Sequence, residues 1–319
     1  MDLLVTGATG FVGGALVPRL LAAGHRVRCL VRDRTRLTAP WRRDVEVVEG
    51  PVESEQAVLR AADGAEAAYF LVHGMGTSTR GLVERERAAA AAFRDGVDLA
   101  GVRHVVYLGG LVDEAELSTT SVHLYARQQA GVELRRGPVP VTELRAGIVL
   151  GEGSASFDLL VAAARAPVAL AAPWSRSLTQ PIAVDDLLAL LLMVVEQPPG
   201  RHLILDVGGP DVVTYAELVR RTRTVLGTGR GLPVKVPYLP PETVALAAAS
   251  RAGVSPSLAV GLLPSAAHDA IVRDDQLAAW YPGVVRTPLD TALAAAVGAR
   301  STSVVADAPG GGSPTSPAG

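Results

Sequence analysis

Short apolar runs alternate with longer amphipathic stretches along most of the chain. The runs are rich in Val and Leu and have the length of strands, whereas the stretches between them carry apolar residues at helical spacing. The expected strands are residues 1–6, 26–31, 44–49, 66–72, 103–108, 140–145 and 201–207. The expected helices are residues 11–23, 54–62, 80–100, 154–165 and 214–226. Strands that alternate with helices favour βαβ units and an α/β fold.

Three glycines separate the first expected strand from the first expected helix. Gly7, Gly10 and Gly13 have the spacing G-x-x-G-x-x-G, which differs from the general fingerprint G-x-G-x-x-G. Glycines let a backbone turn tightly and approach a pyrophosphate, whose charge then lies at the N–H groups and positive dipole end of a helix. The strand–turn–helix context predicts a dinucleotide site. Its residues are Gly7, Thr9, Gly10, Phe11, Val12 and Gly13.

One residue conflicts with the first expected helix. Pro18 lies inside residues 11–23. A proline there removes a backbone hydrogen bond and is expected to disturb the helix.

Composition narrows the classes of partner. The chain has 319 residues, 49% of them hydrophobic, with a net charge of −2 and a pI near 6.3. This charge gives no electrostatic argument for a nucleic-acid partner. The single cysteine, Cys29, excludes an internal disulfide and is expected to be buried.

Neither long apolar stretch fits a membrane span. Residues 187–195 are too short, and residues 244–260 are interrupted by polar residues and a proline. With no apparent leader before the first strand, we expect a cytoplasmic protein without a transmembrane segment. A peripheral membrane contact through the Ala-rich C-terminal region stays open.

The string T-G-A-T-G-F-V-G at residues 6–13 resembles the extended and atypical short-chain dehydrogenase/reductase superfamily. More narrowly, the chain is similar to the NAD(P)H-binding, NmrA-like and YbjT-like group of nucleoside-diphosphate-sugar epimerase relatives. The segments Leu71-Val72-His73 and Thr179–Asp186 (TQPIAVDD) carry the same resemblance. It implies a Rossmann-like, doubly wound parallel sheet of about seven strands with a small, mostly C-terminal lobe.

The resemblance also implies how the chain is divided. We expect an NAD(P)-binding Rossmann-like domain over residues 1–152. Residues 153–300 would complete the sheet and form a substrate lobe, within which the Pro- and Ala-rich residues 233–264 would roof a substrate cleft. From residue 301 onward the Gly-, Ser-, Pro- and Ala-rich chain has little to bury, which predicts a disordered tail over 301–319.

The end of the second strand normally reads the adenine ribose of the cofactor. An arginine there pairs with the 2′-phosphate of NADP, whereas a carboxylate accepts a hydrogen bond from the 2′-hydroxyl of NAD. Arg32 follows the strand directly, with Arg34 and Arg36 behind it, which favours NADP(H). The adjacent Asp33 leaves NAD(H) open. After the third strand, Pro51 stands where relatives carry an aspartate, so the expected adenine contact is weakened.

The candidates for catalysis depart from the family pattern. Leu71 and Val72 would lie beside the cofactor, and His73 is a candidate for proton transfer, although such a histidine can instead hydrogen-bond its own turn. Reductases of the superfamily use a Tyr as proton donor with a Lys four residues later, which lowers the pKa of the phenol. Tyr125 is the candidate donor, but Gln129 follows it at that spacing. The only lysine is Lys235, so the Tyr/Lys pair is absent.

Two further features have structural interpretations. Arg127 would supply positive charge, but two positions after Tyr125 it lies on another face of the helix. Asp185 and Asp186 fit capping and lobe docking better than a metal site, because an isolated acid pair predicts metal poorly.

Three functions compete on these observations. The first is an NADP(H)-dependent oxidoreductase that acts on a small apolar or quinone-like substrate, with a proton from Tyr125, His73 or water. The second is a non-enzymatic NAD(P)H sensor or scaffold, as some NmrA-like proteins are. The third is a sugar-nucleotide epimerase or dehydratase, which relies on the missing Tyr/Lys pair and therefore fits less well.

Overall fold

The computed structural model covers the chain from Met1 onward with several gaps in what it describes. The residues that it does not describe are 74–79, 113–120, 172, 230, 236–242, 244–248, 252, 257–258, 261–265 and 307–319.

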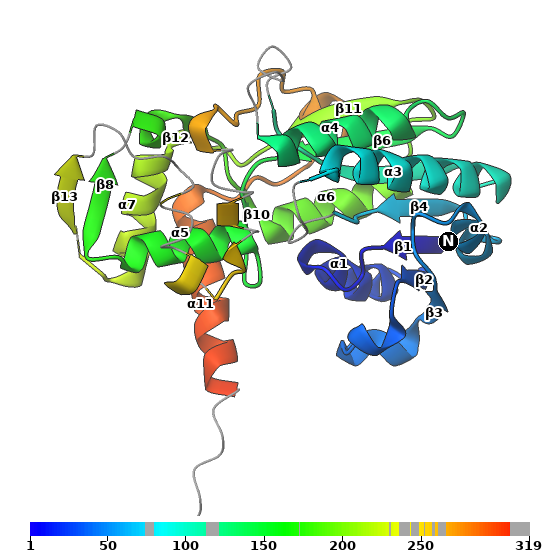
Figure 1. The fold of residues 1–319 in the computed structure, drawn as a ribbon, viewed down its shortest axis with the longest axis horizontal. Coiled ribbons are helices and arrows are strands. Elements are labelled where there is room, and N and C mark those ends of the chain that lie inside the picture. Colours follow the sequence, from blue (N-terminus) through cyan, green and yellow to red (C-terminus); the bar gives the residue numbers. More distant parts are fainter. Residues whose placement is uncertain are drawn as a thin grey trace, which may run out of the picture.

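A parallel sheet of seven strands forms the centre of the molecule (Figure 1). The strands are β1 (Asp2–Thr6), β2 (Arg26–Val31), β3 (Glu46–Glu49), β4 (Ala67–Phe70), β5 (His104–Gly110), β6 (Val141–Ala146) and β11 (Leu203–Val207). Their spatial order is β11-β6-β5-β4-β1-β2-β3, and each neighbouring pair is parallel. This confirms the expected Rossmann-like fold. Because the order reverses between β1 and β4, their carboxyl ends form the switch point at which open α/β sheets bind ligands.

Helices cover both faces of the sheet. On one face lie α1 (Phe11–Ala22) and α6 (Val184–Glu196), and on the other lie α2 (Glu55–Ala62), α3 (Leu82–Leu99) and α4 (Val122–Leu134) (Figure 1). Successive side chains of a strand point to opposite faces. Leu3 of β1 therefore packs with the α1 and α6 side chains, whereas Leu4 packs with those of α2 and α3.

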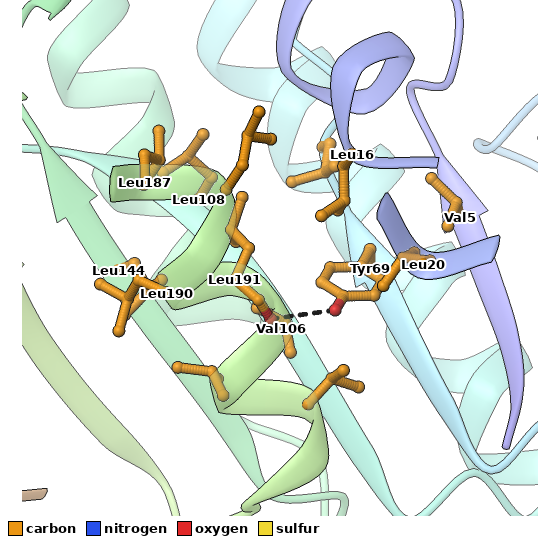
Figure 2. Close-up of a cluster of buried hydrophobic side chains, with 14 of the residues drawn as sticks. Val5, Leu16, Leu20, Tyr69, Val106, Leu108, Leu144, Leu187, Leu190 and Leu191 are labelled. Carbon is orange, nitrogen blue, oxygen red and sulfur yellow. Dashed lines mark hydrogen bonds between the residues drawn. The ribbon is translucent and has the colours of Figure 1, made fainter. Parts of the chain in front are cut away.

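The core between the sheet and helices α1 and α6 contains one buried polar contact. The Tyr69 hydroxyl, on β4, donates a 3.0 Å hydrogen bond to the carbonyl oxygen of Leu191 on α6 (Figure 2). Apolar side chains such as Leu16, Leu20 and Leu187 surround it. The bond satisfies a hydroxyl that would otherwise be costly to bury, and it fixes α6 against the switch point.

The C-terminal half contributes a lobe of short elements beside the sheet. They are β7 (Val149–Leu150), α5 (Ala155–Arg165), β8 (Val168–Ala171), η4 (Pro173–Arg176), β9 (Leu178–Thr179), β10 (Ile182–Ala183), β12 (Val213–Thr214), α7 (Tyr215–Leu226), β13 (Leu232–Lys235), α10 (Leu277–Trp280) and α11 (Leu289–Ala306). Strands pair as β7–β10, β9–β12 and β8–β13. Phe157, Leu218 and Leu293 lie in a separate apolar core shared by α5, α7 and α11.

The two adjacent aspartates at the start of α6 hold the molecule together. Asp185 forms an ion pair with Arg19 of α1. Asp186 accepts hydrogen bonds from the Thr287 backbone N–H at 2.6 Å and from its hydroxyl at 2.8 Å. Thr287 directly precedes α11, so this contact ties the lobe to α6, as the docking interpretation of the acid pair expects.

Three helix features refine the expectations. Helix α1 runs without interruption through Pro18, because its core residues Leu16, Val17 and Leu20 are fully buried and packing holds the helix. Ser121 caps α4 by accepting from the Leu124 N–H at 3.3 Å. Helix α11 continues to Ala306, past the residue at which the disordered tail was expected to begin, and residues 307–319 lie outside the described residues.

Two connections complete the description of the sheet. The short helices η1 (Arg34–Arg36) and η2 (Pro40–Asp44) link β2 to β3. The expected roof, residues 233–264, falls mostly outside the described residues.

Candidate functional site

The turn between β1 and α1 is built so closely that glycine is required at two positions. Gly7 has a φ of +78°, and a Cβ there would lie 2.5 Å from the carbonyl oxygen of Leu71. A Cβ on Gly13 would lie 2.8 Å from the carbonyl carbon of Gly7 and closer still to its oxygen. Gly10 donates a 2.9 Å hydrogen bond from its N–H to the Gly7 oxygen. Gly7 therefore allows the left-handed turn, and Gly13 allows α1 to pack onto it.

The amino end of α1 faces the switch point with its backbone. Gly10 is the N-cap residue, and within the described residues no side chain caps the first turn of this helix. By contrast, Ser54, Ser121 and Ser154 cap α2, α4 and α5 with their hydroxyls. A twelve-residue helix concentrates positive partial charge at such an end, and its first N–H groups are available to an anion.

Leu71 and the glycine turn are brought together, as the sequence predicts. The Thr6 hydroxyl donates to the Tyr69 carbonyl at 2.9 Å and accepts from the Leu71 N–H at 3.4 Å. These bonds lock the carboxyl ends of β1 and β4 side by side. Leu71 is buried against Gly7, and Val72 follows it at the same edge of the sheet. The role of Thr6 was not foreseen from the sequence, because a strand hydroxyl gives no pattern of its own.

The end of β2 places the two residues expected to read the ribose. Arg32 is exposed, and its guanidinium lies 3.2 Å from the carboxylate of Glu53. Asp33 accepts hydrogen bonds from the Thr35 N–H at 2.9 Å and from its hydroxyl at 2.6 Å, which lowers the pKa of the Asp33 carboxyl. Asp33 thus caps the short helix η1, whereas Arg32 projects toward solvent.

His73 lies just beyond β4. Its Nδ1 atom is buried, and no hydrogen-bond partner for it lies among the described residues. Burial, with a smaller contribution from the positive charge of Arg127, lowers the pKa of His73 well below its usual value. The imidazole is therefore neutral near pH 7, so it can accept a proton but is a poor proton donor.

Tyr125 and Arg127 lie on different faces of α4, as expected. Tyr125 is in the first turn of the helix, and its side chain is partly exposed at 37%. Arg127 points inward, where its guanidinium donates to the carbonyl oxygens of Leu108 at 2.9 Å and Gly109 at 2.8 Å. It therefore brings a positive charge to the carboxyl end of β5, at the ligand edge of the sheet. The sequence analysis missed this contact, since helical spacing says nothing of the sheet beneath.

Glycines at the end of β5 make room for this arrangement. A Cβ on Gly110 would lie 2.6 Å from the Leu124 side chain and 3.6 Å from a guanidinium nitrogen of Arg127. Relatives place a hydroxyl residue shortly after this strand. Here the space is taken by α4 itself.

A buried ionic cluster lies behind the site. Glu143 on β6 is 1% exposed and pairs with Arg135 and with Arg145, the latter at 2.9 Å. A Cβ on Gly109 would lie 2.9 Å from the Glu143 carboxylate, and one on Gly131 would be equally obstructed. The cluster joins α4 to the sheet. No sequence signal indicated it, because its members come from separate elements.

Two classes of feature are not found in the described part of the chain. No group of three or more His, Cys, Asp and Glu side chains there is arranged to hold a metal ion. Within the same residues, no helix combines the length and the apolar character that crossing a bilayer requires.

Comparison with known proteins supports the same site. Residues 7–155, which include the glycine turn, match the model of a family described as NAD(P)H-binding. The ceramide reductase of Caulobacter vibrioides (strain NA1000 / CB15N) is 31% identical over 228 residues, which cover 70% of this chain and 70% of that protein.

Two solved structures share the fold. A nucleoside-diphosphate-sugar epimerase from Staphylococcus aureus superposes with a TM-score of 0.72 at 14% identity, over 92% of this chain and 100% of the other. The triphenylmethane reductase of Citrobacter sp. superposes with a TM-score of 0.69 at 18% identity, over 92% and 99%. At these identities the likeness shows the fold alone. Together with the family match and the ceramide reductase relative, it places the chain in the NAD(P)H-binding family of the atypical and extended short-chain dehydrogenase/reductase superfamily.

Proposed function

We propose that this protein is an NADP(H)-dependent oxidoreductase that acts on a small apolar or quinone-like substrate. The observation that carries the proposal is the glycine turn between Gly7 and Gly13, which presents the amino end of α1 at the switch point of the sheet. A pyrophosphate there would accept hydrogen bonds from the first N–H groups of α1. Thr9, Phe11 and Val12 belong to the same turn and would line the dinucleotide.

The residues at the end of β2 support NADP(H) over NAD(H). The guanidinium of Arg32 is exposed and can turn toward a 2′-phosphate. Asp33, the residue that would favour NAD(H), already accepts two hydrogen bonds from Thr35. We therefore assign Arg32 to the 2′-phosphate and a structural role to Asp33.

The lobe supports an apolar substrate. Its described core is made of Leu, Val, Phe and Ala side chains from α5, α7 and α11. A relative at 31% identity is named for ceramide, which is a lipid. Both observations favour a substrate bound chiefly by apolar contacts rather than by charge.

Reduction needs a hydride and a proton. A bound reduced nicotinamide supplies the hydride to the substrate, and the chain must supply a proton to the oxygen that becomes a hydroxyl. Tyr125 is the candidate donor among the side chains, because its phenol is partly exposed and carries a proton near pH 7. His73 is neutral there and suits acceptance of a proton in the reverse direction. Water is the remaining donor.

A non-enzymatic NAD(P)H sensor is the second candidate, and one observation favours it. Gln129 stands where the Tyr/Lys pair would need its lysine, whereas the glycine turn is intact. Epimerase or dehydratase chemistry fits less well, since it relies on the same missing pair.

Calorimetric titration with NADPH and, separately, with NADH tests the proposal. We expect NADPH to bind more tightly, and Arg32→Ala to weaken NADPH binding more than NADH binding. Oxidation of bound NADPH by quinones or small carbonyl compounds would then separate a reductase from a sensor. Equal loss of both affinities in the Arg32 variant would overturn the 2′-phosphate assignment, and binding without turnover on any such substrate would favour the sensor.

A further inference from the structure

Two arginine–glutamate pairs lie together at the carboxyl ends of β2 and β3. Arg32 pairs with Glu53 at 3.2 Å, and Arg34 pairs with Glu49 at 3.1 Å. Both arginines belong to the stretch that follows β2, and both glutamates follow or end β3. The basic side chains expected at the adenine ribose are thus already opposed by carboxylates.

The two arginines differ in how firmly they are held. Arg34 also donates to the carbonyl oxygen of Val47 at 3.2 Å, which fixes it along β3. In the described part of the chain, Glu53 is the one side chain that holds the guanidinium of Arg32. Arg32 is also the more exposed of the two, at 68% against 54%. It is therefore the arginine that can leave its partner for a ligand.

Glu53 is placed by the start of α2. It directly precedes Ser54, whose hydroxyl caps the helix by accepting from the Ala57 N–H at 3.3 Å. Gly50 lets this segment approach closely, because a Cβ there would lie 2.7 Å from the Ala57 Cβ. The carboxylate of Glu53 is therefore fixed beside Arg32 by the backbone, whether or not a cofactor is bound.

We propose that Glu53 is a selectivity-determining residue that competes with the 2′-phosphate of NADP(H) for Arg32. This inference rests on the proposed function, in which Arg32 reads that phosphate. An incoming 2′-phosphate must displace the Glu53 carboxylate from the guanidinium, whereas the 2′-hydroxyl of NAD(H) makes no such demand. Glu53 therefore keeps the preference for NADP(H) modest.

The expected effect is small but specific. Exposed ion pairs of this kind contribute little, so we expect Glu53→Gln to raise NADPH affinity by about two- to five-fold. The affinity for NADH is expected to stay unchanged. Because exposed pairs are screened by salt, the gain is expected to shrink as ionic strength rises.

Calorimetric titrations of the full chain with NADPH and NADH test the inference in four variants. Glu46→Gln is the matched control, since Glu46 pairs with Arg28 at 2.8 Å at the opposite end of the same two strands and its loss changes the net charge equally. Arg32→Ala and the double variant of Arg32→Ala with Glu53→Gln complete a double-mutant cycle.

Three outcomes separate the ideas. A gain for NADPH in Glu53→Gln that disappears in the Arg32→Ala background supports competition for Arg32. An equal gain in both backgrounds, or in Glu46→Gln, would overturn competition and leave general charge repulsion. If Arg32→Ala weakens NADPH binding while Glu53→Gln changes nothing, the inference fails but the proposed function stands; if neither nucleotide binds any variant, both fail.

Discussion

Gly13 packs so tightly on Gly7 that a Cβ at residue 13 would lie 2.8 Å from the carbonyl carbon of Gly7. The same Gly7 residue has a φ of +78° and lies against Leu71 on β4. The turn thus links β1, α1 and β4 through backbone contacts alone. The amino end of α1 keeps its position at the switch point only if this packing is preserved.

We expect Gly13→Ala to abolish NADPH binding, because the added methyl must push α1 away from the turn. Gly14→Ala is the matched control, since a Cβ there would meet its nearest atom, the Ala8 oxygen, at 3.5 Å, an ordinary contact. Alanine is the better helix former, so Gly14→Ala is expected to keep binding and to gain about 0.5–1 kcal/mol in the free energy of unfolding. Calorimetry and urea unfolding measure both quantities. Equal binding by the two variants would contradict the role given to Gly13.

Tyr125→Phe tests the proton donor. If the phenol supplies the proton, the variant is expected to lose turnover by about 100-fold or more while keeping its affinity for NADPH. Its side chain is 37% exposed, so removal of the hydroxyl is expected to leave stability nearly unchanged. Steady-state kinetics with a quinone or small carbonyl substrate, together with calorimetry, separate the two effects. Unchanged turnover would remove Tyr125 from the mechanism and leave water as the donor.

Arg127 is expected to matter for both stability and electrostatics. Arg127→Met leaves the carbonyl oxygens of Leu108 and Gly109 without their donor, which costs about 1–3 kcal/mol per unsatisfied buried group. Loss of its charge is expected to raise the pKa of His73, but not to its usual value, because burial is the larger cause. Arg127→Lys keeps the charge and loses the fork, so stability is expected to fall with a smaller change at His73. NMR titration of the imidazole and urea unfolding give these values; a fully restored pKa in Arg127→Met would contradict the ranking of causes.

Local patterns were sufficient to predict the sheet and the phosphate-binding turn. The strand from 26 to 31 matches β2, and the glycine turn and the helix after it are where the spacing places them. The reason is physical: alternation between apolar runs and amphipathic stretches, and the need for glycine in a turn around a phosphate, are both recorded within a few neighbouring residues. The seven strands and the lobe followed from the family resemblance.

The polar partners were not predictable in the same way. Arg127 meets β5, Glu143 meets Arg135, and Arg32 meets Glu53 through contacts between separate elements. Helical spacing correctly separated Arg127 from Tyr125, but it could not show what lies beneath α4. Pairing register and helix packing decide these contacts, and neither is written in the local sequence.

His104 makes the stability of this protein depend on pH. Its side chain is 2% exposed on β5, and its Nε2 atom lies 2.9 Å from the hydroxyl oxygen of Thr142 on β6. Burial lowers the pKa of His104 from 6.5 to about 4. The unfolded chain therefore binds a proton below pH 6.5 that the folded chain binds only near pH 4.

The sign of the effect follows from this order. The contribution of neutral His104 is fully present above pH 6.5 and is lost as the pH falls toward 4, by about 3 kcal/mol at most. His104→Gln keeps a hydrogen-bonding group but cannot titrate, so its stability is expected to fall less between pH 7 and pH 4. Thr142→Val is the control, because it removes the hydroxyl partner at every pH but keeps the titrating ring. Urea unfolding across this range distinguishes them: parallel losses of stability in wild type and His104→Gln would show that the ring is protonated in the folded state at its ordinary pKa.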